Sequence, residues 1–288
     1  MITYKLGKHI YRIPSRWTDI TPDDDPMIFI RMCRAFELFE TGKMDFQTFR
    51  LAMVAACLNM DVTRIRDNND IMAENIFRLE DYVKFPYDVQ ENEDGSRTVS
   101  MKIQLCQNLL PSIKKNTGYR FCITPEGMVD CNISAEQYVD ALDLMELYSS
   151  SRKDDVLDNL FRTLYHGGSS NVSRDIKVAV YYNFRGILEW IQLLPDFRLI
   201  FSSRTKKRSA SNPLGLSASI FTLSKSGYGT LQEIKSLDLL SYLGALVQLN
   251  IDAILSLQSA GLKPGEIAEK LNLPLESILP YITTESKE

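Results

Sequence analysis

The sequence predicts a mainly α-helical protein of the α+β class: a helical bundle with small antiparallel β-hairpins at the N-terminus and in the middle. Two observations lead to this prediction. Apolar residues recur at three- and four-residue spacing over most of the 288 residues, which is typical of amphipathic helices. Short alternating segments bounded by Gly or Pro lie within residues 2–13 and about 84–132. The content of 44% hydrophobic and 24% charged residues is that of an ordinary globular protein.

The N-terminal part begins with a predicted hairpin over residues 2–13, where apolar and polar residues alternate. The run Asp23–Asp25 before Pro26 predicts a helix start, because carboxylates favour the positive end of the helix dipole and proline tolerates the first turn. This helix carries the apolar stripe Phe29, Met32, Cys33, Phe36 and Phe39 and ends at Gly42. A second helix is expected from Asp45, and a third over residues 69–82.

The middle of the chain has the pattern of a small antiparallel sheet. Asp94-Gly95 is a turn signal between residues 87–89 and 98–101. A second hairpin is predicted from residues 119–124 and 128–130. A short helix near 103–110 is expected between the two hairpins.

The chain returns to helices at Ser134, which forms a predicted capping box with Gln137. Further helices are expected over 153–165 and from Ser173 to just before Pro195. Residues 202–213 are polar and basic, which favours an exposed loop or an internal boundary. We therefore predict a helical domain over 1–201 with the inserted sheet at about 84–132, a basic loop over 202–213, and a C-terminal helical subdomain over 214–288.

A helix predicted over 234–260 is apolar over most of its circumference. Its polar residues form one narrow stripe: Asp238, Ser241, Gln248, Asp252, Ser256 and Ser259. Such a helix is either central to the core of one chain or covered by a partner, and the sequence leaves both readings open. For the second reading, the hypothesised interface comprises Leu239, Tyr242, Leu243, Leu246, Leu249, Leu262, Ile267 and Leu271.

The C-terminal segment 261–280 has the pattern of a helix-turn-helix. Ile267, Ala268 and Leu271 occupy its packing positions. In DNA-binding versions the next helix enters the major groove, but residues 274–280 hold no Lys, Arg, Asn or Gln and include Glu276. Base and phosphate recognition needs such donors. Protein packing is therefore favoured, and a DNA-binding regulator remains an alternative.

A basic cluster is formed by Arg204, Lys206, Lys207 and Arg208. It is either a solvated loop or a contact for an acidic partner surface or for phosphates. It has no interleaved aromatic residues, which argues against stacking on single-stranded nucleic acid. The net charge of −4 also argues against bulk attraction to nucleic acid or to anionic membranes.

Residue types that carry catalysis are sparse. There are two histidines, His9 and His166, and the glycine-rich stretch 167–170 lacks the lysine of a phosphate-binding loop. The five cysteines include no CxxC pair, which predicts free thiols in a reducing compartment and no zinc site. We expect no secretion signal and no membrane span, since the longest apolar candidate is residues 242–247. The prediction is a non-enzyme with no cofactor and no metal.

Three phrases of the chain together resemble a protein family of tailed phages that infect Bacteroidetes, including the crAss-like group. The first is Tyr11-Arg12-Ile13-Pro14-Ser15-Arg16-Trp17-Thr18-Asp19-Ile20-Thr21, similar to an Ile-Pro-Ser-x-Trp-x-x-Ile-Thr phrase that follows the family's opening hairpin. The second is Gly42-Lys43-Met44-Asp45-Phe46. The third runs from Gly227-Tyr228-Gly229 through Tyr242-Leu243 to Gly261-Leu262-Lys263-Pro264-Gly265-Glu266-Ile267-Ala268. The likeness covers about a third of the length and leaves out the middle sheet, and Pro22 with the three aspartates departs from the family's Leu-x-x-Phe/Tyr helix start.

The resemblance implies a non-enzymatic component of phage tail or neck morphogenesis, made in the bacterial host cytoplasm. One expectation is a virion structural subunit that forms a homo-oligomeric ring and contacts other tail or neck proteins. The other is a tail assembly chaperone that is absent from the mature particle. The family has no catalytic residues to transfer to this chain, and nucleic acid is not the expected partner.

Overall fold

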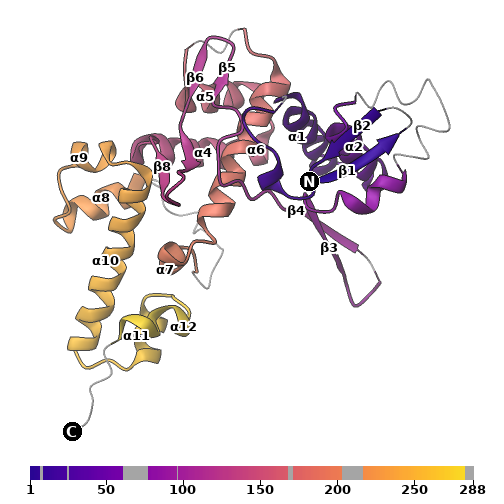
Figure 1. The fold of residues 1–288 in the computed structure, drawn as a ribbon. Helices are drawn as coiled ribbons and strands as arrows, with labels where there is room; N and C mark the ends of the chain where they lie inside the picture. Colours follow the sequence, from indigo (N-terminus) through magenta and orange to yellow (C-terminus); the bar gives the residue numbers. More distant parts are fainter. Residues whose placement is uncertain are drawn as a thin grey trace. The chain divides into compact units, whose positions relative to one another are not determined.

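The computed structural model describes residues 1–6, 9–24, 26–60, 77–95, 97–167, 171–202 and 217–282 (Figure 1). The predicted fold class is confirmed: the chain is mainly α-helical with small antiparallel sheets. It divides into two compact units. Unit 1 comprises Met1–Asp130 and Ser151–Trp190, and unit 2 comprises Cys131–Ser150 and Ile191–Glu288.

Unit 1 begins with the predicted hairpin of β1 (Ile2–Leu6) and β2 (His9–Ile13), followed by a 3-10 turn at Trp17–Asp19. Helices α1 (Pro26–Glu40) and α2 (Phe46–Cys57) come next, as expected. The carboxylate of Asp45 caps α2 by accepting the backbone N–H of Thr48 at 2.9 Å. The stripe predicted for α1 faces the core, because Phe29, Met32, Cys33 and Phe36 are buried.

Aromatic side chains form the core between these helices. The ring of Phe36 lies 6.3 Å from Trp17, 5.9 Å from Phe49 and 5.5 Å from Tyr182. The ring of Tyr87 stands edge-on to Phe49 at 5.7 Å. Aromatic pairs at such distances stabilise a core beyond the area they bury, so this cluster joins the N-terminal helices to the middle of the chain.

The middle of unit 1 holds the predicted hairpins and one further sheet. β3 (Tyr87–Glu91) pairs with β4 (Arg97–Met101), and β7 (Phe121–Ile123) pairs with β8 (Val129–Cys131). The sheet that the sequence did not predict orders three short strands as β5-β6-β9: Ser112–Ile113, Asn116–Gly118 and Tyr165–His166. Strands of two or three residues are too short to show a period. Of the helix expected at 69–82, residues 69–76 lie outside the described residues, and Glu80–Tyr82 form a 3-10 turn.

The prediction of a helix near 103–110 was wrong. Its backbone groups bond to α6 (Arg174–Ile191) instead of to each other. The N–H of Ile103 donates to the Glu189 carboxylate at 3.2 Å, and the N–H of Leu105 donates to the Gly186 carbonyl at 3.0 Å. The apolar spacing that suggested a helix serves an extended segment buried against α6. Helix α5 (Asp154–Leu164) precedes α6 and completes unit 1.

Unit 2 is helical. Its elements in chain order are α4 (Ala135–Ser151), a 3-10 turn (Pro195–Phe197), α7 (Arg198–Phe201), α8 (Ser217–Lys225), α9 (Leu231–Ser236), α10 (Leu239–Ser259), α11 (Pro264–Lys270), α12 (Leu275–Ile278) and a final 3-10 turn (Leu279–Tyr281). Within this unit α10 is the longest helix, with α8 and α9 beside its N-terminal part and α11 and α12 beside its C-terminal part (Figure 1).

The single helix predicted over 234–260 is two helices, because the chain turns at Leu237 and Asp238. The N–H of Ala135 donates to the Leu237 carbonyl, and the N–H of Leu239 donates to the Ile133 carbonyl, both at 2.8 Å. This isolated bridge pairs Ser134 with Asp238. It also explains why α4 groups with the C-terminal helices, where we had predicted a helical domain over 1–201 and a subdomain over 214–288.

Two glycines allow a matched test of the packing. Gly186 on α6 faces the extended segment, where an added Cβ would lie 2.6 Å from Ile103 and 2.8 Å from Leu105. Gly244 on α10 has no atom within 4 Å of that position. We expect Gly186→Ala to lower the free energy of unfolding by about 1–3 kcal/mol through overpacking. Gly244→Ala should raise it by about 0.5–1 kcal/mol through helix propensity. Urea denaturation followed by circular dichroism measures both, and equal effects would contradict the packing of residues 103–105 on α6.

Candidate interaction surfaces

The polar stripe predicted on α10 is the exposed side of that helix. All six of its residues are exposed, whereas Leu239, Tyr242, Leu243 and Ile254 on the opposite side are buried. The stripe is also internally bonded: Gln248 donates to the Asp252 carboxylate at 2.8 Å, and the hydroxyl of Tyr228 donates to it at 2.6 Å. That hydrogen bond raises the pKa of Tyr228 to about 12.

The structure separates the hypothesised interface residues into two groups. Four of them are buried inside unit 2 and belong to its core: Leu239, Tyr242, Leu243 and Ile267. The other four are only partly buried: Leu246, Leu249, Leu262 and Leu271. Leu262 and Leu271 pack against an apolar cluster centred on Ile254 and Ile267. Leu246 and Leu249 lie on the flank of α10 that borders the polar stripe, and we call these two residues the α10 flank.

The C-terminal helices α10, α11 and α12 pack together around one apolar cluster. Ile267 and Ala268 of α11 are buried, and they join Ile254 of α10 and Ile278 of α12 in one cluster. Helix α12 has four residues, and the exposed positions at and after it are Glu276, Leu279 and Pro280. An acidic side chain and apolar ones offer no donor to a phosphate or a base edge, so this geometry favours protein packing.

By length and composition, α10 is the one helix among the described residues that has the properties of a membrane span. The mean hydropathy of its most apolar stretch is 1.4. We expected residues 242–247 to be the longest apolar candidate and did not identify this longer stretch from the sequence. Its stripe carries Asp252, and a carboxylate is costly within a bilayer. Part of its remaining surface packs on α7, α8 and α11.

A second surface of unit 2 is a groove between α4, α8 and α9, which was not among the sites expected from the sequence. The groove has a volume of about 350 Å³. Val139 and Ile220 lie in its lining, and the exposed rings and side chains of Phe221 and Leu231 form apolar walls. Phe221 is 42% exposed and Leu231 is 38% exposed. Large apolar side chains gathered in one hollow with this exposure are typical of a contact site.

The walls of this groove are held by helix caps. Thr230 and Glu233 form a capping box at the start of α9, with the Thr230 N–H donating to the Glu233 carboxylate at 2.8 Å. Lys235 near the end of α9 reaches Glu136 on α4, with 2.8 Å between ammonium and carboxylate. The predicted capping box of Ser134 and Gln137 starts α4 and is confirmed by two bonds of 3.1 Å.

The rim of the groove on α4 is acidic. Glu136, Asp140 and Asp143 are exposed on one side of the helix, since residues three and four apart share a face. Partial burial raises the pKa of Asp140, and the charges of Glu136 and Asp143 raise it further, while Lys235 lowers it. Three carboxylates thus stand near one ammonium group, and the rim keeps an excess of negative charge. The spacing 136, 140, 143 was readable in the sequence, but only the fold places it beside apolar walls.

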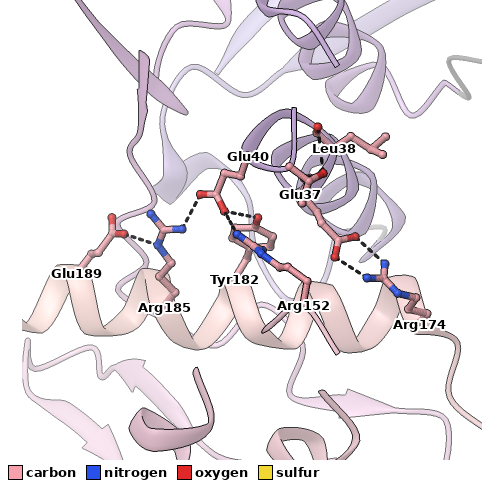
Figure 2. A network of polar contacts seen from close by, with 9 residues as sticks. Glu37, Leu38, Glu40, Arg152, Arg174, Tyr182, Arg185 and Glu189 are labelled. Carbon is pink, nitrogen blue, oxygen red and sulfur yellow. Dashed lines mark hydrogen bonds and ion pairs between the residues drawn. The ribbon is translucent and has the colours of Figure 1, made fainter. Parts of the chain in front are cut away.

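A network of charged side chains lies in unit 1, where α1 faces α6 (Figure 2). The carboxylate of Glu40 accepts hydrogen bonds from Arg185 at 2.7 Å, from the Tyr182 hydroxyl at 2.9 Å and from Arg152 at 3.1 Å. Burial by itself would raise the pKa of Glu40, but the charge and hydrogen bond of Arg185 and the bonds from Tyr182 and Arg152 hold it below its ordinary value. Every contact of this carboxylate is therefore of the kind that stabilises its charged form.

The network extends to both sides of Glu40. Glu37, one turn earlier on α1, binds the guanidinium of Arg174 through two parallel bonds of 2.6 and 2.7 Å (Figure 2). On the other side Arg185 also donates to Glu189 at 2.9 Å. Because these carboxylates are held in their charged form by guanidinium and hydroxyl donors from α6 and Arg152, we interpret the cluster as a clamp between α1 and α6.

The described residues include no group of three or more His, Cys, Asp or Glu that could hold a metal ion. His166 lies exposed at the end of β9, and the side chain of His9 is not among those described. The five cysteines are free, with Cys33 and Cys57 buried as expected. The basic cluster Arg204, Lys206, Lys207 and Arg208 lies outside the described residues.

Comparisons of the chain with protein-family models, curated proteins and solved structures found no match. The proposed function below is therefore inferred from the sequence and structure of this chain.

The clamp of unit 1 predicts a pH-dependent loss of stability. Glu40→Gln removes the charge that Arg152 and Arg185 face, and we expect the free energy of unfolding at pH 7 to fall by about 2–4 kcal/mol. Because the pKa of Glu40 is lowered in the folded state, its contribution is complete above its unfolded pKa of about 4.3 and is lost as the pH falls through the folded value. The difference between wild type and variant should therefore shrink below pH 4 in urea titrations.

Glu93→Gln is the matched control, because Glu93 lies exposed in the turn between β3 and β4. It should leave the unfolding curve unchanged at both pH values. A Glu40→Gln chain as stable as this control at pH 7 would show that the clamp contributes nothing.

Proposed function

We propose that this chain is a non-enzymatic assembly protein: a phage virion structural subunit of the tail or neck, repeated in a ring and acting through protein–protein contacts. The phage context comes from the resemblance of the N- and C-terminal phrases. The contact function is supported by the distribution of apolar surface in unit 2. It is also supported by the clamp of unit 1, in which the charged side chains form ion pairs with one another.

The observation that carries the proposal is the incomplete covering of α10. Only 28% of its most apolar stretch is buried within the chain, although that stretch is apolar enough for a core. Leu246 and Leu249 stay partly exposed on the α10 flank, and Leu255 is 39% exposed. In a ring, each subunit uses two different surfaces head to tail, and a neighbour would cover such a flank.

A tail assembly chaperone is the second candidate, because it would use the same apolar flank on a tail protein before assembly. Mass spectrometry of purified particles separates the two: a structural subunit appears at a fixed copy number, and a chaperone is absent. A helix-turn-helix DNA-binding regulator is the third candidate, and the acidic and apolar surface of α12 disfavours it. A gel shift at physiological salt tests it.

Charge on the α10 flank should prevent self-association without unfolding the chain. We expect Leu246→Glu with Leu249→Glu to weaken assembly by at least about 30-fold, as for the loss of an interface hot spot of about 2 kcal/mol. Light scattering during size-exclusion chromatography measures the assembly, and circular dichroism checks the fold. Leu243→Glu should unfold unit 2 instead, since Leu243 is buried.

Gln248→Glu on the exposed stripe is the control for added charge, and it should assemble like the wild type. A wild-type chain that stays monomeric and binds no tail protein would falsify the proposal. Assembly of the flank variant at wild-type concentration would remove α10 from the interface.

A further inference from the structure

The groove between α4, α8 and α9 combines apolar walls with an acidic rim. Its walls are apolar, with Phe221 and Leu231 both partly exposed into one hollow. Its rim on α4 is acidic through Glu136, Asp140 and Asp143. A segment rich in Lys and Arg fits both properties, because the aliphatic stems of these side chains cover apolar surface while their charged ends reach carboxylates. Arg also stacks favourably on an aromatic face.

The rim charge is not balanced within the groove. Lys235 is engaged with Glu136 at 2.8 Å, and the pKa of Asp140 stays raised by burial and by the carboxylates on either side. Cationic groups placed beside Asp140 and Asp143 would relieve this repulsion. The groove is therefore complementary in charge to a basic segment and not to an acidic or neutral one.

The chain itself supplies such a segment. Arg204, Lys206, Lys207 and Arg208 place four positive charges within five residues, in a protein whose net charge is −4. We infer that the groove between α4, α8 and α9 is a docking site for the basic run 204–208 of a second copy of this chain. This inference rests on the proposed ring: groove and basic run are two different surfaces, as a head-to-tail contact requires.

The test uses two charge-reversed variants of the full chain. The groove variant carries Asp140→Lys and Asp143→Lys, which leaves the pair of Glu136 and Lys235 in place. The run variant carries Lys206→Glu and Lys207→Glu. We expect each variant alone to self-associate at least about tenfold more weakly than wild type at low salt. Wild-type association should weaken as NaCl is raised from about 50 to 300 mM, because exposed charges are screened.

Mixing the two variants distinguishes contact between copies from contact within one copy. In the mixture the intact run of a groove variant meets the intact groove of a run variant. The reversed groove of the first variant and the reversed run of the second are also opposite in charge, so the mixture should assemble beyond the dimer. A chain carrying all four substitutions should likewise recover assembly, because the charges are exchanged. Sedimentation velocity resolves monomers from larger assemblies.

The control carries Glu91→Lys and Glu93→Lys in the exposed β3–β4 hairpin, with the same change of net charge as the groove variant, and should assemble like wild type. A mixture that stays monomeric would overturn the inference in favour of docking within one chain. Single variants that assemble like wild type would overturn it in favour of another occupant, such as a basic segment of a different tail protein. In that case the α10 flank variant and the particle analysis would still test the proposed function. A monomeric wild type would overturn both.

Discussion

The pairing of two helix N-caps is the constraint on which unit 2 depends. Ser134 caps α4 and Asp238 caps α10, and the two residues form one antiparallel bridge across more than a hundred positions of sequence. One turn further along each helix, Tyr138 and Tyr242 meet with their ring centroids 6.0 Å apart. Each cap satisfies backbone groups that a helix end leaves open, so the bridge fixes the starts of both helices together. Helix α9 ends at Ser236, directly before this bridge, and its residues Leu231, Gln232 and Lys235 line the groove.

In unit 1, charged side chains hold α1 against α6. Helix α1 is apolar toward the aromatic core but carries Glu37 and Glu40 on the side that faces α6. Removing one partner of a partly buried ion pair strongly lowers the free energy of unfolding. The intact pair contributes more to the specific arrangement of the two helices than to net stability. The forked bonds of Arg174 and Arg185 therefore set how α1 lies along α6. The same bonds hold both carboxylates in their charged form, as expected for a structural clamp.

The functional proposal follows from where apolar and charged surface remains. In unit 2 the α10 flank and the groove are accessible, and they differ in chemistry: one is apolar, and the other is apolar with an acidic rim. Two unlike surfaces on one chain are what a head-to-tail assembly needs, whereas a symmetric dimer needs one. Helix α10 therefore has both a core side and a proposed interface side. Leu243 lies on the core side, and Leu246 and Leu249 lie on the interface side.

By itself the sequence determined the fold class, most helix starts and both long hairpins, because caps, turn residues and periodic stripes act over a few neighbouring positions. Asp45, Ser134 and Asp94-Gly95 are such signals. Only the tertiary structure decided that residues 103–110 are extended, that the 234–260 segment is broken at Asp238, and that Leu239, Tyr242, Leu243 and Ile267 are core. It also brought the carboxylates at 136, 140 and 143 beside Phe221 and Leu231. In each case the deciding partner is distant in sequence, as Gly186 is for Leu105 and Ile133 is for Leu239, and a local pattern contains no information about such a partner.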